Sequence, residues 1–206
     1  IERYYKYNVS DVDLVKYKQS DEIVNDITSY VNDLTNEAIF KDDLITRDFV
    51  YTADELNDML KNRYSRFPLF LRITSMADKI SEINYNSNMS KSKSICKMLF
   101  DKLNVDKDYA VIYINFFKSK YAKIKSNSDI DHKFLNYEDA CLLVYLKGIL
   151  EGFNYNTYIK QVVIDEAQDY TKLQYMIIKK IFRNASFTIL GDTNQTINPY
   201  YKYNSL

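Results

Sequence analysis

The sequence is poor in the residues that build disulfides, metal sites and membrane spans. It has two cysteines, one histidine and no tryptophan among 206 residues. Cys96 and Cys141 lie in separate amphipathic segments without metal-ligand spacing, so we interpret both as reduced core thiols of a cytosolic protein. His132 has no cysteine or second histidine nearby, which favours a structural role over metal binding. Because the chain has no run of about 18 apolar residues and no apolar signal region, we predict a cytoplasmic protein without membrane contact.

Glycine is also scarce, at three residues, whereas tyrosine reaches 20, a pattern that we attribute to coding bias. The chain is 46% hydrophobic and 27% charged, which indicates a globular rather than a disordered protein. Its length fits one or two domains. The sequence starts without methionine and stops abruptly at Leu206, so we expect a piece of a longer protein.

The net charge is zero, but the charges are unevenly distributed. Residues 1–59 carry 6 basic and 14 acidic side chains, whereas residues 60–135 carry 15 basic and 7 acidic ones. Such blocks indicate either two faces with different partners or two surfaces that face each other within one fold. The sequence leaves both interpretations open.

Hydrophobic periodicity predicts mainly helical structure before residue 131. Thr52 and Glu55 form a capping-box pattern that opens one of these helices. The predicted elements are an edge strand at 2–9, helices at 19–38, 53–63, 68–84, 90–103 and 108–124, and a short hairpin within 39–51. Residues 125–131 are the candidate linker, and Asn136 is expected to cap a helix over 137–151.

Two apolar segments near the C-terminus end in carboxylates. Residues 162–164 form a β-branched run, typical of a strand buried on both faces of a parallel sheet, and stop at Asp165-Glu166. Residues 187–190 form a second run and stop at Gly191-Asp192. The segment 173–182 between them has helical periodicity, which predicts a βαβ unit. Both polar ends are therefore expected at the same edge of the sheet.

Carboxylates at that edge are better placed to bind a ligand than to pack in the protein core. Open α/β sheets bind ligands at the carboxyl ends of their strands. Carboxylate oxygens are hard ligands for Mg²⁺, which proteins hold together with substrate phosphates. A second carboxylate beside the metal can orient or deprotonate a water molecule. The alternative interpretation of Asp165-Glu166 is an acidic strand end that arose by chance. The alternative for Gln195 is an ordinary turn residue without a role in binding.

These segments resemble a known family. Asp165-Glu-Ala-Gln-Asp169, followed by Gly191-Asp-Thr-Asn-Gln195, resembles motifs II and III of the UvrD/Rep-like superfamily 1 helicases. The resemblance is strongest over residues 137–200. It implies an α/β fold in which residues 132–206 form part of a RecA-like motor domain with a parallel sheet. Residues 1–131 would then form a mainly helical inserted domain.

The resemblance also implies ATP and Mg²⁺ as cofactors of the longer protein, and a role for each matching residue. Asp165 would coordinate Mg²⁺, and Glu166 would activate the hydrolytic water. Gln195 would act as the second catalytic residue by sensing the γ-phosphate. Three further residues would bind the nucleotide or couple it to neighbouring motifs: Gln168, Asp169 and Asp192.

The chain also departs from the family pattern. It contains no Gly-x-x-x-x-Gly-Lys-Ser/Thr phosphate loop, so we expect that this chain alone does not hydrolyse ATP. The second RecA-like domain and its arginine finger are missing too. Residues 196–203 keep tyrosines that could stack on a base, but they lack the Arg-Gly element of DNA-translocating relatives.

With these departures, the chain is more similar to HelD-like proteins, the ATP-driven RNA polymerase recycling factors, than to other members of the family. In that group an insertion splits the first RecA-like domain before motif II. The similarity lies in residues 137–140, 164–170, 173–175, 185–191 and 194–195. It implies that residues 1–135 hold an arm that binds RNA polymerase. The alternatives are an ATP-dependent 3′–5′ DNA helicase whose insertion contacts DNA, and a stand-alone interaction protein with a degenerate motor remnant.

Overall fold

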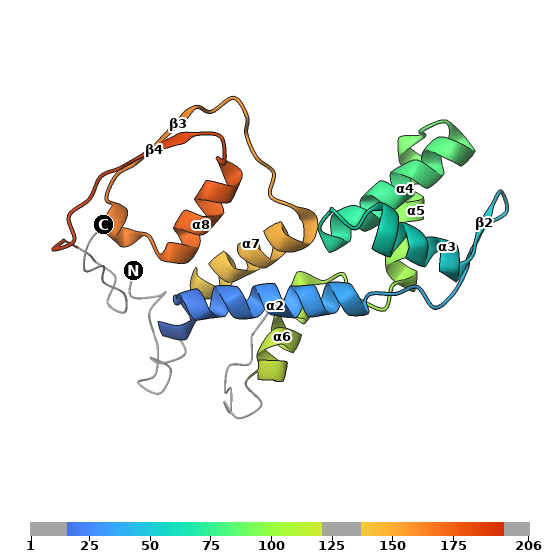
Figure 1. Cartoon of the computed structure of the whole chain (residues 1–206), viewed down its shortest axis with the longest axis horizontal. Coiled ribbons are helices and arrows are strands. Elements are labelled where there is room, and N and C mark those ends of the chain that lie inside the picture. The colour runs from blue at the N-terminus through green and yellow to red at the C-terminus, as the bar shows by residue number, and fades with distance from the viewer. Residues whose placement is uncertain (1–15, 121–136, 196–206) are drawn as a thin grey trace. The chain divides into compact units, whose positions relative to one another are not determined.

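Helices make up most of the chain in the computed structural model, which describes residues 16–120 and 137–195 (Figure 1). The chain divides into two compact units whose segments alternate along the sequence. The sheet unit comprises residues 1–28, 122–148 and 153–206, and the helical unit comprises residues 29–121 and 149–152. Four predictions lie outside the described residues: the edge strand at 2–9, the linker at 125–131, His132 and the helix cap Asn136.

The helices and the short hairpin form close to their predicted positions. Leu44 pairs with Tyr51 and Ile45 pairs with Val50 across the antiparallel hairpin. The elements of this part are α2 (Asp21–Glu37), β1 (Leu44–Ile45), β2 (Val50–Tyr51), α3 (Ala53–Asp58), η2 (Met59–Arg63), α4 (Leu69–Tyr85), α5 (Met89–Lys102) and α6 (Tyr109–Lys120). Helix α2 begins in the sheet unit and ends in the helical unit.

The capping box at the start of α3 is confirmed. The Glu55 amide donates to Thr52 Oγ1 at 3.2 Å, and the Thr52 amide donates to Glu55 Oε2 at 2.8 Å. Beyond Asp58 the helix continues as the π-helical turn η2 rather than as an α-helix. The Arg72 guanidinium holds the region after this turn by donating to carbonyl oxygens of Leu60, Ser65 and Phe67. Hydrophobic periodicity alone could not distinguish the π-helical turn from α-helix.

Helices α4 and α5 form a hairpin around a fully buried apolar core. Asn86 and Ser87 make its turn, both with positive φ (51° and 63°), and Asn86 serves as the C-cap of α4. Asn88 then caps α5 by accepting from the Lys91 amide at 3.1 Å. The residues with 0% exposure in the helical unit include Leu56, Leu60, Ile73, Met76, Ile80 and Leu99. Full burial of such side chains contributes roughly 1.5–3 kcal/mol each.

The sheet unit contains the predicted strand–helix–strand segment. Strand β3 (Gln161–Ile164) pairs in parallel with β4 (Ser186–Ile189), so that Ile164 lies opposite Ile189. Helix α8 (Lys172–Ile181) connects them, after the 3₁₀ turn η3 (Ala167–Asp169). A second capping box opens α8, because Thr171 and Gln174 exchange hydrogen bonds. The mixed helix and sheet content agrees with the predicted α/β class.

The prediction that these strands are buried on both faces is wrong for the described chain. Val163 is 60% exposed and Ile189 is 48% exposed, whereas only Ile164 of β3 is buried. Burial on both faces requires helices or strands on each side of the sheet. Within the described residues this parallel sheet has only two strands, so their outer side chains stay accessible.

Helix α7 (Tyr137–Glu151) forms as predicted and contributes a buried ion pair to the sheet unit. Asp139 is 4% exposed and accepts from Lys18 Nζ at 2.6 Å. None of the helices in the described parts of the chain is long and apolar enough to cross a membrane.

Candidate functional site

The carboxyl ends of β3 and β4 emerge at one edge of the sheet, as the parallel pairing requires. The ladder continues past the strands, because the Leu190 amide donates to Ile164 O at 2.8 Å and the Ala167 amide donates to Leu190 O at 2.9 Å. Asp165 and Glu166 therefore follow one strand beside the segment that leads to Asp192. We call this region the carboxylate edge, defined by Asp165–Asp169 and Gly191–Gln195.

Glu166 makes the chain turn sharply at the end of β3. Its backbone is left-handed, with φ 49° and ψ 43°, and the Asp169 amide donates to its carbonyl oxygen at 3.0 Å. For a residue with a Cβ this conformation costs roughly 1–2 kcal/mol. Contacts of the next residue stabilise this strained conformation. Ala167 is fully buried, and its carbonyl oxygen accepts from Tyr175 Oη at 2.7 Å.

Gln168 joins the two strand ends. Its side chain is almost fully buried at 2% exposure. Its Nε2 donates to Glu166 Oε2 at 2.7 Å, and its Oε1 accepts from the Asp192 amide at 2.9 Å. A buried amide that uses both ends in this way fixes the orientation of the Glu166 carboxylate relative to the second loop.

Asp192 organises the second loop. Its Oδ1 accepts from the Asn194 amide at 2.9 Å, and its Oδ2 accepts from Gln195 Nε2 at 2.9 Å. The hydrogen bonds from Asn194 and then Gln195 lower the pKa of Asp192 below its usual value. The structure therefore brings Gln195 against Asp192, and among the described residues no hydrogen bond joins Gln195 to Asp165 or Glu166.

The donor set at the carboxylate edge fits Mg²⁺ held together with phosphates. Asp165 and Glu166 are both exposed, and Asp165 Oδ1 accepts from the Glu166 amide at 2.9 Å. Asp169, the third carboxylate of the pentapeptide, is half-buried in η3. The described residues contain no group of three or more side chains able to enclose a metal. Mg²⁺ needs only one or two carboxylates when water and substrate phosphates complete its coordination.

Tyr175 is a positioning residue that sequence reasoning missed. It lies on α8 and holds the strained turn through the Ala167 carbonyl oxygen. Burial, followed by the neighbouring Tyr170, raises the pKa of its hydroxyl, so Tyr175 stays a hydrogen-bond donor at neutral pH. The only sequence signal was a tyrosine four residues after the helix cap Thr171, which does not reveal this contact.

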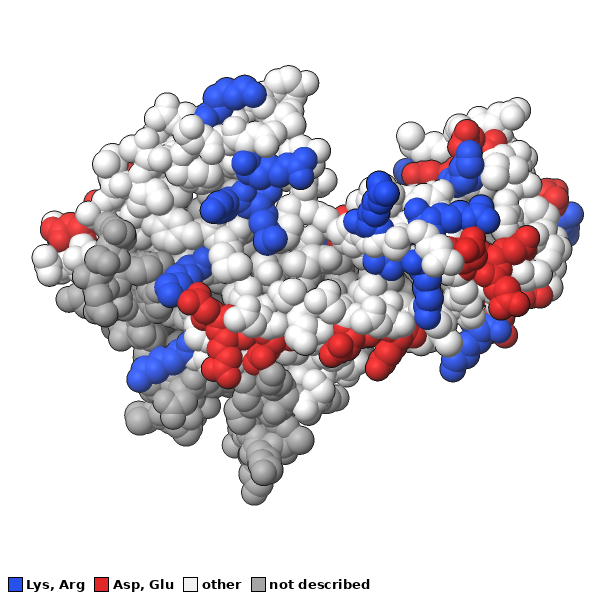
Figure 2. Space-filling view, viewed as in Figure 1, with Lys and Arg blue, Asp and Glu red and all other residues white. Residues whose placement is uncertain are grey.

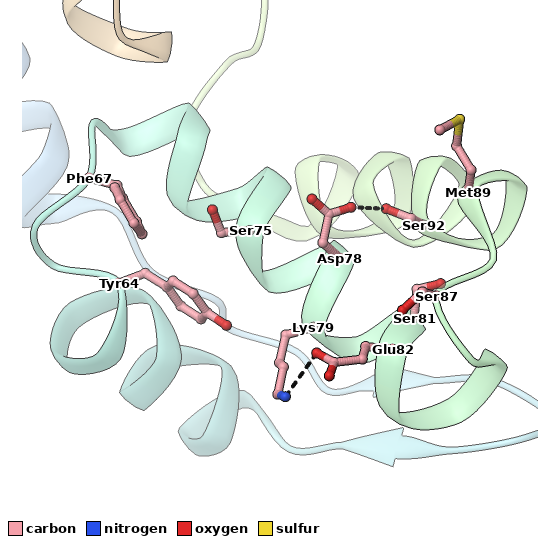
Figure 3. A pocket seen from close by; sticks show the side chains of 10 residues that line it. All are labelled: Tyr64, Phe67, Ser75, Asp78, Lys79, Ser81, Glu82, Ser87, Met89 and Ser92. Atoms are coloured by element: carbon pink, nitrogen blue, oxygen red, sulfur yellow. Dashed lines mark hydrogen bonds and ion pairs between the residues drawn. The ribbon is translucent and has the colours of Figure 1, made fainter.

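A separate pocket of about 530 Å³ lies in the helical unit (Figure 3). The rings of Tyr64 and Phe67 stack on one side of it, with centroids 6.3 Å apart. Its charged groups already have partners: Lys79 pairs with Glu82 at 2.9 Å, and Asp78 accepts from the Ser92 hydroxyl. None of the predicted site residues lines this pocket. We therefore place the candidate chemistry at the carboxylate edge.

Comparison with family models identifies the chain. Residues 4–203 match the model of the UvrD/REP helicase N-terminal domain. The chain belongs to this family. UvrD/REP helicases are ATP-dependent motors, which agrees with the prediction of a helicase-like ATP hydrolase. The match covers nearly the whole chain and therefore extends well beyond residues 137–200, where the resemblance of the motifs is strongest. No curated protein matches the chain in a direct comparison.

Proposed function

We propose that the carboxylate edge is the ATP-hydrolysis site of a RecA-like motor domain. The observation that carries this proposal is the buried Gln168 bridge between Glu166 and Asp192. It combines two loops, separated by a helix in the sequence, into one polar site. Such preorganisation suits phosphoryl transfer, in which catalysis depends mainly on positioning and charge stabilisation.

Each residue at this edge has a proposed task. Asp165 would hold Mg²⁺, which when bound offsets the negative charge of the phosphates. Glu166 would orient the attacking water and accept its proton. Its Oε2 is held by Gln168, while its Oε1 makes no hydrogen bond to any described residue. Gln195, held at Asp192, would contact the γ-phosphate. Asp169 would couple the nucleotide to neighbouring segments.

The proposal assigns residues 132–206 to the RecA-like domain and residues 1–131 to an inserted domain. Since the sequence has no phosphate loop, we expect hydrolysis only in a protein that supplies one. In such a protein, Glu166→Gln should lower kcat by about 100-fold or more, because it removes the general base but keeps the side-chain size. Gln161→Glu, an exchange at the start of β3, is the matched control. Equal loss in both variants, or no loss in Glu166→Gln, would contradict the assignment.

For the partner, we propose RNA polymerase, bound through residues 1–135 as in HelD-like recycling factors. The similarity around motifs II and III supports this proposal, and the acidic and basic blocks of the sequence offer contrasting surfaces. The alternative is an ATP-dependent 3′–5′ DNA helicase whose insertion contacts DNA. Membership in a helicase family is compatible with contact to nucleic acid.

Co-elution of the chain with core RNA polymerase, in the presence of labelled single-stranded DNA, separates these two proposals. Moderate salt should be used, because phosphate-dominated DNA binding weakens steeply as salt rises. Retention with polymerase while the DNA elutes separately is the expected result. Retention of the chain on DNA alone would overturn the polymerase proposal and favour the helicase.

A further inference from the structure

A pocket in the helical unit takes no part in the proposed motor site. It is the cavity of about 530 Å³ shown in Figure 3, and it lies between the loop after η2 and the helices α4 and α5. We call it the α4 pocket, defined by the rings of Tyr64 and Phe67, by the face of α4 from Ser75 to Glu82, and by lining residues within 87–92. All of these residues belong to the helical unit, whereas the carboxylate edge belongs to the sheet unit. The α4 pocket is therefore a separate candidate for binding.

The two rings at one end of the α4 pocket are held in place by the loop that carries them. The Phe67 amide donates to Tyr64 O at 3.0 Å, which closes the turn between the rings. Arg72 fixes the same turn, because its guanidinium donates to Ser65 O and to Phe67 O, each at 2.7 Å. Phe67 nevertheless stays 43% exposed. The loop thus presents a stacked ring pair that needs no ordering when a ligand binds, which lowers the entropic cost of association.

Two carboxylates of α4 lie further along the pocket, and each has one oxygen held and one oxygen available. Asp78 Oδ1 accepts from the Ser92 hydroxyl, and Glu82 Oε2 accepts from Lys79 Nζ at 2.9 Å. Within the part of the chain that the structure describes, Asp78 Oδ2 and Glu82 Oε1 accept no hydrogen bond. Because the two residues are four positions apart in one helix, they lie on the same face. The pocket therefore offers two oriented acceptors beside the rings (Figure 3).

The charge balance of the α4 pocket favours a cation. Its charged lining residues are Asp78, Glu82 and Lys79, so the carboxylates exceed the ammonium group by one charge. On the face shown in Figure 2, acidic and basic side chains are interspersed over α3 and α4. That face has no broad field of one sign that would attract a polyanion or a polycation. Recognition therefore depends on the groups inside the pocket.

We propose that the α4 pocket binds an arginine side chain presented by a partner protein. A guanidinium is planar, so it can stack on the ring of Tyr64 or Phe67 while its fork of N–H groups donates to Asp78 and Glu82. A lysine ammonium shares the charge but lacks the planar face and the fork. A phosphate would be repelled by both carboxylates. The site does not depend on nucleotide hydrolysis at the carboxylate edge.

The test is an NMR titration of the backbone amides of the full chain with a Gly-Arg-Gly tripeptide that is blocked at both ends. Two matched probes carry citrulline, in which a neutral urea replaces the guanidinium, or lysine. The arginine peptide should shift amides within 64–67, 75–82 and 87–92. The Kd of the citrulline peptide should be about tenfold higher or more, because it loses the charge. The Kd of the lysine peptide should be about threefold higher or more, because it loses stacking and the fork.

Variants of the chain test the two halves of the pocket. Asp78→Asn should raise the Kd of the arginine peptide about tenfold, because it removes a charged acceptor and keeps the side-chain size. Tyr64→Ala should raise it about threefold, whereas Tyr64→Phe, which keeps the ring, should change it by less than about twofold. Asp101→Asn removes an exposed carboxylate of α5 outside the pocket lining and is the matched control. It should change Kd by less than about twofold, because salt screens exposed charges.

Three outcomes would overturn the proposal. The first is an arginine peptide that shifts no amide of the pocket up to its solubility limit. The second is a citrulline or lysine peptide that binds as tightly as the arginine peptide. The third is an equal loss of affinity in Asp78→Asn and Asp101→Asn. The amide spectrum of each variant, recorded without peptide, shows whether the variant is folded.

Discussion

Two parts of this chain differ in how far they bury their apolar residues: the α4–α5 hairpin with the α3 segment, and the strand pair of β3 and β4. In the helical unit, the α4–α5 hairpin and the α3 segment contain side chains with no exposure at all, such as Ile73 and Leu99. In the strand pair, Val163, Ile189 and Leu190 are 60%, 48% and 51% exposed, and the described residues supply only two strands to this sheet. Next to these strands, the buried residues Gln168 and Thr171 hold the carboxylate edge and the start of α8 by hydrogen bonds. The hairpin therefore depends mainly on apolar packing, whereas the carboxylate edge depends more on polar contacts.

The largest effect should come from removing apolar volume. Leu99→Ala in the helical unit is expected to lower the free energy of unfolding by about 2–5 kcal/mol, because it leaves a cavity at a fully buried position. Leu190→Ala, the same exchange at a residue that is 51% exposed, should cost less than about 1 kcal/mol. Urea denaturation measures both. Equal losses would show that the hairpin and the strand pair do not differ in this way.

The next effect should come from the polar bridge of the sheet unit. Gln168→Ala is expected to cost about 1–3 kcal/mol, because it removes a buried side chain and leaves the Asp192 amide and the Glu166 carboxylate without their partner. Gln161→Ala removes an exposed glutamine whose Nε2 donates to Thr188 Oγ1 at 3.2 Å, and it should cost less than about 0.5 kcal/mol. Denaturation of both variants by urea provides the comparison. If the Gln168 variant is as stable as the Gln161 variant, the Gln168 bridge does not stabilise the fold.

The two capping boxes provide a smaller and more closely matched pair. Thr171→Ala at α8 should cost about 1–2 kcal/mol, since Thr171 is buried and its hydroxyl is the partner of the Gln174 amide. Thr52→Ala at α3 should cost about 0.5–1 kcal/mol, since that cap is exposed to water. Thermal unfolding resolves this difference. A larger loss at Thr52 would argue against the greater dependence of the region around the carboxylate edge on polar contacts.

The smallest effect concerns pH at the carboxylate edge. Because hydrogen bonds lower the pKa of Asp192 in the folded protein, its stabilising contribution is complete above the unfolded pKa of about 4. The contribution is lost as the pH falls through the lower folded pKa. NMR of the Asn194 and Gln195 amides between about pH 6 and pH 2 should show this single transition. Asp192→Asn should abolish it, and a transition that persists in this variant would assign the titration to another group.

Several features followed directly from local sequence patterns. The helix bounds, both strands with their parallel order, and the capping box of Thr52 and Glu55 depend on periodicity and on residues three apart. The convergence of Asp165-Glu166 and Asp192 followed from the pairing of parallel strands. The family match confirmed the helicase resemblance that these residues carried.

The missed features depend on contacts between distant residues. The exposure of Val163 depends on how many strands and helices cover the sheet, which an apolar run does not encode. The π-helical turn at Met59–Arg63 has the same residue types as an α-helix. The hydrogen bond from Tyr175 to Ala167 and the double role of Gln168 arise only after the chain has folded around Glu166.

The most direct test of the proposed site is paramagnetic broadening of backbone amide signals by Mn²⁺, which substitutes for Mg²⁺, in the presence of ATP. The account predicts preferential broadening of residues 165–168 and 191–195, and its loss in Asp165→Asn. The exposed adjacent carboxylates Asp42 and Asp43 serve as an internal control within the same chain. Equal broadening around that pair, or unchanged broadening in Asp165→Asn, would contradict the assignment of the carboxylate edge as the metal and nucleotide site.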